Sequence, residues 1–349
     1  MNKIRTDLLD WFGANARYMP WRSDPTPWHV WVSEIMLQQT RVESVLEYFA
    51  RFMKRFPTPT HVAKAPVEDM LDAWAGLGYY SRARNLHHAC RTIEADHGGH
   101  VPDDPEVFGA LKGVGQYTRG AVMSIAFGRA EPIVDGNVER VFSRLFLVED
   151  NVRLTPTKKR LWALAREWID QLPPEQKPGD VNQAVMELGA LICLPKTPKC
   201  ERCPVQKHCK AFATNRVHEL PVKSKPAPKK TVHLKALLCT DAEGKIWVTR
   251  RPNTGLLAGL WSLPMQPIEP DAFELTAEPT AQIKHAFTHL IWHVDLYRVP
   301  APLNKPLKEW GEIAQAMTVA ELAKVALGGP SLKALIKAGV QLPRRRGAG

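Results

Sequence analysis

The stretch LKGVGQYTRGAVMSIAFG, residues 111–128, decides the fold of the first half of the chain. A short apolar run leads into a turn with Gly113 and Gly115, and a longer run of helical spacing follows. Glycine allows close backbone approach, and the amides and dipole at the next helix start favour an anion. The pattern therefore predicts a helical hairpin that can hold a phosphate, although such a turn alone more often marks an ordinary hairpin.

Apolar residues at three-and-four spacing continue on both sides of this hairpin, as far as about Ala213. Glycine or proline interrupts them repeatedly, so we expect a series of separate helices. The expected helices span residues 30–52, 67–75, 82–96, 105–111, 117–127, 138–147, 158–171 and 181–191. This half of the chain should form an all-α domain.

In the second half of the chain, the spacing of the apolar residues is different. Alternating apolar residues, rich in β-branched and aromatic types, predict strands, and two later segments have helical spacing. The expected strands span residues 232–239, 245–250 and 290–299, and the expected helices 319–326 and 331–338. A run rich in proline and lysine precedes them and should be an extended tether. We therefore expect a multidomain protein, divided into an all-α domain (1–215), a linker (216–231), an α+β domain (232–341) and a disordered basic tail (342–349).

Four cysteines crowd the run CLPKTPKCERCPVQKHC, residues 193–209. They are Cys193, Cys200, Cys203 and Cys209, separated by six, two and five residues. This spacing departs from the short paired knuckles of structural zinc sites and favours an iron–sulfur cluster. Structural zinc stays an alternative, and a pair of disulfides is a weaker one. Cys90 and Cys239 lie far away in apolar segments, where a free cysteine usually packs as a small hydrophobe.

Composition points to a polyanionic partner. The 349 residues are 44% hydrophobic, enough for about two domains, and 47 Lys and Arg outnumber 36 Asp and Glu to give a net charge of +11. Such an excess often serves a nucleic acid, although part of it lies in the linker and tail. We see neither a signal peptide nor a long apolar run, so we expect a cytoplasmic protein with reduced thiols.

Two carboxylates lie in unusual surroundings. Asp135, in PIVDGNVERVFSRL (132–145), precedes a glycine and a helix, where most such residues are turn formers or caps. Glu34, in WHVWVSEIMLQQTRV (28–42), shares an expected helical face with Gln38 and Arg41, and most such glutamates are solvated. The neighbouring tryptophans are Trp21, Trp28 and Trp31. An apolar surround raises a carboxyl pKa, which would let Glu34 carry a proton near neutral pH.

Five motifs together carry a resemblance to a known family. They are LKGVGQYT (111–118), IVDGN (133–137), SEIMLQQTRV (33–42), GLGYYSRARNL (76–86) and the four-cysteine run. Their order and spacing over residues 5–213 resemble the endonuclease III superfamily, and most closely its adenine DNA glycosylases. The resemblance implies a helix-hairpin-helix domain, a [4Fe-4S] cluster on the four cysteines, and excision of a base flipped out of double-stranded DNA.

The resemblance also implies catalytic roles. Glu34 matches a general acid that protonates adenine at N7, and Asp135, kept ionised by the adjacent helix start, would stabilise or capture an oxocarbenium-like sugar. Asn137 and Tyr117 match supporting positions. Tyr117 stands where bifunctional relatives have a lysine, and a phenol cannot form a Schiff base. We therefore expect a monofunctional glycosylase that leaves an abasic site.

Further positions match residues that contact DNA in the family. Trp21, Arg22 and Glu187 would line the adenine pocket, and Gly113 and Gly115 would hold the DNA backbone. The residues expected to enter the duplex when adenine leaves are Gln39, Thr40 and Tyr79. Their amide, hydroxyl and phenol groups can stack or hydrogen-bond in the opened duplex. Taken alone, Tyr79 and Tyr80 would be read as a packed aromatic pair.

The second domain resembles the family's Nudix-like domain through GLLAGLWSLP (255–264) and KHAFTHLIWHVDLYRV (284–299). Residues 265–279 lack the glutamate-dense pattern that holds magnesium in Nudix hydrolases, so we expect recognition without hydrolysis. By resemblance Phe287, Thr288 and His289 would contact 8-oxoguanine opposite the adenine. The expected substrate is therefore adenine opposite 8-oxoguanine or guanine.

Two other classes stay open at this point, a bifunctional glycosylase/lyase and a DNA-binding module without catalysis. Strand cleavage without alkali would support the lyase. A binding module would need no paired carboxylates. We expect a monomer, because one chain with two tethered domains could enclose a duplex.

Overall fold

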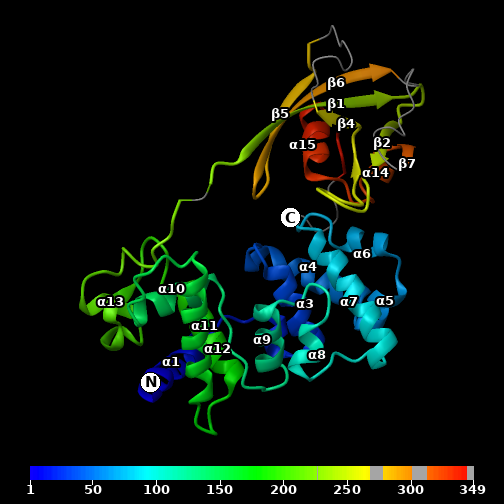
Figure 1. Ribbon diagram of the computed structural model, residues 1–349. Helices are drawn as coiled ribbons and strands as arrows, with labels where there is room; N and C mark the ends of the chain where they lie inside the picture. The colour runs from blue at the N-terminus through cyan, green and yellow to red at the C-terminus, as the bar shows by residue number, and fades with distance from the viewer. Residues whose placement is uncertain (226, 268–277, 301–312, 344–349) are drawn as a thin grey trace. The chain divides into compact units, whose positions relative to one another are not determined.

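The computed structural model in Figure 1 describes residues 1–225, 227–267, 278–300 and 313–343. The chain divides into two compact units. The first comprises Met1–Lys64 and His88–Pro226, and the second comprises Ala65–His87 and Ala227–Gly349. The expected fold class is confirmed, since the first unit is helical and the second contains a sheet with helices. None of the helices in the described ranges has the length and apolarity needed to cross a bilayer.

Helices form the described part of the first unit. The α-helices that lie wholly within it are α1 (Asn2–Asn15), α2 (Pro20–Ser23), α3 (Pro27–Leu37), α4 (Val42–Arg55), α5 (Pro59–Lys64), α8 (Pro105–Gly109), α9 (Gln116–Ile125), α10 (Gly136–Leu145), α11 (Thr155–Asp170), α12 (Pro178–Leu191) and α13 (Lys210–Ala213). Helix α7 (Ser81–His97) begins in the second unit and ends in the first. Proline opens α2, α3 and α12, where its missing N–H costs nothing.

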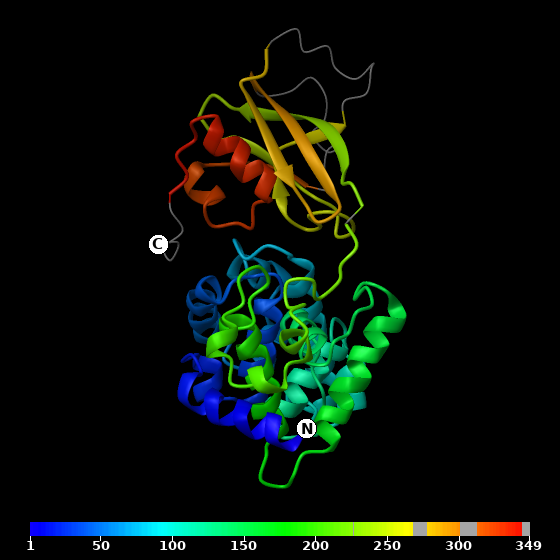
Figure 2. The same cartoon turned by 90° about the vertical axis from the view of Figure 1, so that its left-hand side faces the viewer.

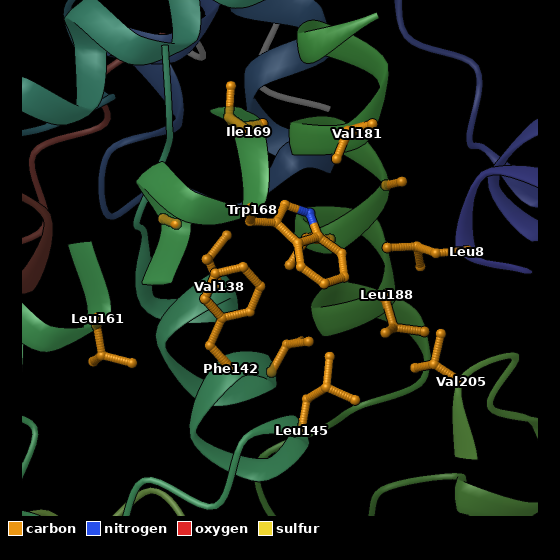
Figure 3. Close-up of a cluster of buried hydrophobic side chains, with 14 of the residues drawn as sticks. Leu8, Val138, Phe142, Leu145, Leu161, Trp168, Ile169, Val181, Leu188 and Val205 are labelled. Atoms are coloured by element: carbon orange, nitrogen blue, oxygen red, sulfur yellow. The ribbon is translucent and has the colours of Figure 1, made fainter. Parts of the chain in front are cut away.

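One hydrophobic core of the first unit lies among α1, α10, α11 and α12 (Figure 3). Phe142 of α10 faces Trp168 of α11 with ring centroids 5.6 Å apart, and Leu8 and Leu188 pack into the same cluster. Burying a large apolar side chain stabilises the fold by about 1.5–3 kcal/mol. Val205, from the four-cysteine run, also belongs to this cluster. The core therefore fixes both the start of α10 and the cysteine run.

One expected helix is wrong. Residues 30–52 form two helices instead of one, because α3 ends at Leu37 and α4 starts at Val42. Gln39 between them has a φ of 58°, in the left-handed region that no continuous α-helix passes through. Arg41 consequently precedes α4 as its cap residue and does not share a helical face with Glu34.

The described part of the second unit contains α6 (Val67–Ala73) and a seven-stranded sheet. The strands are β1 (Lys230–Thr240), β2 (Ile246–Arg250), β3 (Trp261–Ser262), β4 (Met265–Pro267), β5 (Ala281–Ala286), β6 (Leu290–Pro300) and β7 (Ile313–Met317). Their order is β3-β2-β1-β6-β5, with β4 also paired to β1 and β7 to β2. Strands β1 and β6 run parallel, and Leu234 is opposite Val294.

Strand β1 is apolar on both faces. Leu234, Ala236 and Leu238 join the larger core of this unit, whereas Leu237 and Cys239 pack with Tyr297 on the opposite face. Helices α14 (Val319–Leu322) and α15 (Gly329–Lys337) complete the unit, and α15, red in Figure 2, packs against the sheet. The expected strands all form, whereas those over 261–262, 265–267, 281–286 and 313–317 are too short or too mixed for the sequence pattern to show.

The first unit continues past residue 215, where we expected the linker to begin. The Val152 amide donates to the Val222 carbonyl at 3.0 Å, and Lys223 pairs with Glu139 at 2.7 Å. These contacts hold the first part of the proline- and lysine-rich segment against the helices, and β1 then starts at Lys230. Three expectations fall partly or wholly outside the described residues: the linker at 226, the segment without a magnesium-binding pattern at 268–277, and the basic tail at 344–349.

Candidate active site

Glu34 lies on α3 in a buried position. The Thr26 hydroxyl caps this helix by accepting a hydrogen bond from the His29 amide at 3.1 Å. Only 4% of Glu34 is exposed, and burial raises its carboxyl pKa to about 7. The negative charge of Asp135 acts in the same direction, whereas the hydrogen bond from Tyr117 opposes it. The side chain can therefore carry a proton near neutral pH.

Two of the tryptophans expected near Glu34, Trp28 and Trp31, lie on α3 itself and pack with other aromatic rings. Trp28 and Trp31 meet edge to face with centroids 5.8 Å apart, and both are buried. Trp31 also packs on Phe108 of α8, at 5.2 Å. These contacts join α3 to the first helix of the hairpin and exclude water from its inner face.

Tyr117 links the hairpin to this carboxyl. It lies in the first turn of α9, and its hydroxyl donates a hydrogen bond to Glu34 Oε2. Burial raises the phenol pKa well above its usual range, and the charges of Glu34 and Asp135 raise it further. Tyr117 is therefore a neutral donor at this site.

Asp135 is the N-cap of α10 and accepts three hydrogen bonds. Its Oδ1 accepts from the Asn137 amide at 2.9 Å and the Val138 amide at 2.7 Å, and its Oδ2 accepts from Asn137 Nδ2 at 2.8 Å. Burial raises its pKa, whereas the resemblance implied that the adjacent helix start keeps this carboxylate ionised. The three donors oppose that rise, because they stabilise the ionised form. Asp135 and Glu34 are therefore close enough for the charge of one to affect the pKa of the other. They accept hydrogen bonds from different donors, one from Tyr117 for Glu34 and three from Asn137 and Val138 for Asp135.

Two arginines of α10 bind the cysteine run, and one of them, Arg140, also links it to the Asp135 side of the site. Arg140 donates to Asn137 Oδ1 at 3.0 Å and to the Cys193 carbonyl at 2.6 Å. Arg144 donates to Cys193 Sγ at 3.3 Å and to the Leu194 carbonyl at 2.8 Å. We did not single out either residue from the sequence. Their separation of four along α10, which places them on one helical face, was the available signal.

Glu187 is a buried carboxylate that pairs with two partly exposed arginines. Its Oε1 accepts from Arg17 Nε at 2.7 Å, and its Oε2 accepts from Arg17 Nη2 at 3.0 Å and Arg22 Nη2 at 2.9 Å. Burial would raise its pKa, but the hydrogen bonds from Arg17 and Arg22 dominate and lower it to about 2. Trp21 is buried beside this network, edge to face with Phe49 at 5.1 Å. The structure thus joins two of the three expected pocket residues and adds Arg17, which the sequence did not indicate.

The hairpin turn has the geometry that its glycines predict. Gly113 has a φ of 86°, where a side chain would be strained. Gly115 is the N-cap of α9 with ordinary extended backbone, and a Cβ added there would meet nothing within 4 Å. No protein atom of the described residues therefore blocks the space beside Gly115, at the start of α9.

Two residues expected to enter the duplex have left-handed backbones. Gln39 has a φ of 58° and is exposed, and Thr40 follows it. In the second unit, Tyr79 has a φ of 48° and is 45% exposed. Residues other than glycine adopt this conformation only where their surroundings enforce it, and such residues cluster at functional sites.

Phe287, Thr288 and His289 form the turn between β5 and β6. The Phe287 amide donates to the Leu290 carbonyl at 2.8 Å, while its ring packs edge to face on Trp292 at 4.9 Å. Thr288 and His289 are both exposed. The turn therefore anchors one aromatic ring and leaves two polar side chains available to a ligand.

The cysteine run presents four free thiols. Three of them pack against the core of the first unit, and all four are partly buried. Burial, together with the charges of the neighbouring cysteines, raises the pKa of Cys203 to about 12, which shows that the four sulfurs share one electrostatic environment. Among the described residues, no three His, Cys, Asp or Glu side chains converge tightly enough for a single metal ion. Four thiols at one place, one of them accepting from an arginine, fit a metal–sulfur cluster. Cys90 and Cys239 are buried as expected.

Comparison with known proteins follows the same division. The HhH-GPD superfamily base excision DNA repair protein model matches residues 32–171, and the NUDIX domain model matches residues 235–337. Adenine DNA glycosylase of Arabidopsis thaliana is 35% identical over 90% of this chain and 55% of its own length, so the chain spans little more than half of that relative. Adenine DNA glycosylase of Buchnera aphidicola subsp. Baizongia pistaciae (strain Bp) is 32% identical over 84% of each chain.

Solved structures agree with the fold of the helical part. A thermostable thymine-DNA glycosylase is 31% identical, with a TM-score of 0.55 over 61% of this chain and 98% of its own. An endonuclease III in a non-covalent DNA complex has a TM-score of 0.51 at 21% identity, which shows the fold alone. With the Buchnera relative matched over most of its length and both domain models in the expected order, the chain belongs to the adenine DNA glycosylase family.

Proposed function

We propose that this protein is a monofunctional DNA glycosylase of base excision repair, which flips out adenine opposite 8-oxoguanine or guanine and removes it to leave an abasic site. The observation that carries the proposal is the carboxyl pair in the first unit. Glu34 has a pKa of about 7, whereas three hydrogen bonds stabilise the ionised form of Asp135. Two carboxyls with different donor sets suit one proton donor and one anion.

The reaction breaks the bond between adenine and C1′ of its deoxyribose. The bonding electron pair leaves with the base, so protonating adenine at N7 makes it a better leaving group. Glu34 donates that proton, and Tyr117 holds the Glu34 carboxyl in place by its hydrogen bond. Asp135 stabilises the positive charge that develops on the sugar, or captures C1′ through a bond that the incoming water then breaks. The water gives its hydroxyl to C1′ and its proton to a carboxylate, Glu34 or Asp135.

The expected lack of lyase activity rests on Tyr117. Strand cleavage by a Schiff base needs an amine that attacks C1′, and the residue at this position has a hydroxyl. Because burial raises its phenol pKa, Tyr117 also does not become a phenolate nucleophile near neutral pH. The abasic site is therefore the product.

Substrate recognition is assigned to four places. Gly113, Gly115 and the start of α9 hold the DNA backbone, Gln39, Thr40 and Tyr79 enter the opened duplex, and Phe287, Thr288 and His289 contact the base opposite adenine. Trp21, Arg22 and Glu187 line the adenine pocket. The net charge of +11 strengthens binding to the duplex. The protein acts as a monomer on chromosomal DNA in the cytoplasm.

Cys193, Cys200, Cys203 and Cys209 would hold a [4Fe-4S] cluster, which supplies electron-transfer chemistry and ties its loop together when bound. Arg144 would orient the Cys193 thiolate through the 3.3 Å contact, since a cationic donor favours the ionised sulfur. Through Arg140, Asn137 and Cys193, the run is also joined to Asp135 by hydrogen bonds.

The test uses an end-labelled duplex that carries adenine opposite 8-oxoguanine, analysed with and without alkali. Asp135→Asn is compared with Asp104→Asn, because Asp104 caps α8 by the same two backbone contacts but is exposed. We expect cleavage only after alkali, lost in Asp135→Asn and kept in Asp104→Asn.

Other outcomes of this test overturn parts of the proposal. Cleavage without alkali would mean a lyase. If protein that holds its cluster and binds DNA gives no product at all, the substrate assignment is wrong. Equal activity of the two variants would limit Asp135 to helix capping.

A further inference from the structure

Arg82 is a nearly buried cation that donates to the backbone of the loop 76–80. It is 8% exposed, at the start of α7. Its Nη2 donates to the Leu77 carbonyl at 3.3 Å and the Gly78 carbonyl at 3.1 Å, and its Nε donates to the Tyr79 carbonyl at 3.4 Å. Three successive carbonyls of the loop 76–80 thus converge on one guanidinium.

This loop has a backbone that needs support. Gly76 and Gly78 have φ values of 104° and 71°, and Tyr79 has 48°. Glycine tolerates such values, but tyrosine does not without compensating contacts. The carbonyls that Arg82 binds lie at and just before Tyr79, so the guanidinium holds the peptide groups whose orientation defines the left-handed turn.

The same guanidinium also contacts two rings. Its central carbon lies 5.5 Å from the centroid of Trp74 and 5.4 Å from that of Tyr79. Trp74 Nε1 donates to the Gly78 carbonyl at 3.2 Å, which adds a second tie to the loop. Tyr79 keeps 45% of its surface exposed despite these contacts. Its backbone is therefore fixed while its ring stays available.

A planar group with several donors is needed for this arrangement. A lysine ammonium is compact and could not lie over both rings while reaching three carbonyls. Burial lowers the Arg82 pKa to about 10, so the group stays charged at neutral pH. A buried cation is costly unless its donors are satisfied. The carbonyls of the loop supply acceptors for it.

We propose that Arg82 is the positioning residue for Tyr79, holding it in the strained backbone from which its ring enters the duplex. This inference rests on the proposed function, because it concerns how adenine is exposed to Glu34 and not the bond cleavage itself. Arg82 acts through Tyr79 and has no contact with the reacting atoms.

The experiment compares Arg82→Lys and Arg82→Met with Arg91→Met, an exposed arginine on the same helix. 2-Aminopurine beside the target adenine reports unstacking, and excess enzyme gives the single-turnover rate. On adenine opposite 8-oxoguanine, we expect both Arg82 variants to lose unstacking and rate by about tenfold, with Arg91→Met unchanged. On adenine opposite an abasic analogue, where no base pair opposes flipping, most of the loss should disappear.

A double-mutant cycle with Tyr79→Ala separates positioning from general damage. If Arg82 acts through Tyr79, Arg82→Lys adds no further loss in the Tyr79→Ala background. Additive losses, or an equal loss on the abasic-analogue duplex, would overturn the inference. So would Arg82 variants that match Arg91→Met. An inactive wild type would instead refute the proposed function, and Arg82→Lys replaces Arg82→Met if the latter unfolds.

Discussion

The Tyr117 hydroxyl donates a hydrogen bond to the Glu34 carboxyl, and this contact joins two segments that lie 83 residues apart. One is α9, the second helix of the hairpin, and the other is the tryptophan-rich helix α3. If the hairpin contacts DNA as proposed, binding of the duplex backbone and placement of the Glu34 carboxyl would depend on the same short helix, α9. A shift of α9 would move the donor that orients Glu34.

The pH dependence of the reaction should follow Glu34. Its pKa is about 7, and a general acid works only when protonated, so the single-turnover rate should fall as pH rises through about 7. Glu34→Gln should abolish this limb together with most activity. A rate in the wild type that rises through the same range would show that Glu34 is not the proton donor.

The same ionisation should affect folding. The folded pKa is raised, so the contribution of Glu34 to stability is complete below its unfolded pKa of about 4.3 and is lost as pH rises through about 7. Relative to Glu34→Gln, the wild type should lose on the order of a few kcal/mol between these limits. Urea unfolding of both proteins at several pH values measures this difference. Parallel stability curves would contradict the buried position.

Tyr117→Phe should shift the acid and leave the hairpin intact. The hydroxyl's hydrogen bond lowers the Glu34 pKa, so removing it should raise that pKa and move the falling limb of the rate to higher pH. The rate below the limb should drop by about tenfold or less, since the acid itself is retained. A pH–rate profile of the variant checks both points. An unmoved limb would mean that the hydroxyl does not act on Glu34.

The sequence predicted the elements and the residue types of this site better than its long-range contacts. Period and glycine placement predicted the hairpin and most helices because these are local properties. The break at Gln39 was missed because nothing local forces glutamine into the left-handed region. Arg17 was missed for another reason: its partner Glu187 lies 170 residues away, and only packing brings them together. Resemblance, not spacing, supplied the roles of Glu34 and Asp135.

Removing one arginine partner of the buried Glu187 carboxylate should reduce folding stability more than neutralising Glu187 itself. Arg17→Met leaves a carboxylate that is 1% exposed with one arginine fewer, which should cost about 3–5 kcal/mol. Glu187→Gln should cost less, and Arg160→Met, in an exposed pair with Asp150, at most about 1 kcal/mol. Chemical denaturation of the three variants gives this order. Equal losses for Arg17→Met and Arg160→Met would show that the Glu187 pair is not desolvated.

The contribution of Glu187 to folding stability should also depend on pH. The folded pKa of Glu187 is lowered to about 2, so its contribution is present above the unfolded value of about 4.3 and is lost as pH falls toward 2. Acid unfolding of the wild type should therefore be steeper than that of Glu187→Gln in this window. The opposite order would mean that the arginines do not hold the carboxylate ionised.

If the run holds the proposed [4Fe-4S] cluster, replacing one of its cysteines should remove that cluster and loosen the start of the tether. Arg144 donates to Cys193 Sγ and also to the Leu220 carbonyl at 3.0 Å, so the run and the segment before β1 share one buried cation. Cys200→Ser should lose iron and sulfide and lower the melting temperature, and proteases should then cut near residues 216–229. Cys90→Ser removes an equally free but buried thiol outside the run and should keep its iron, so it controls for the loss of a sulfur atom. Zinc in place of iron in the purified wild type would mean that the four cysteines form a structural zinc site. Unchanged proteolysis after cluster loss would mean that the cluster does not stabilise the tether.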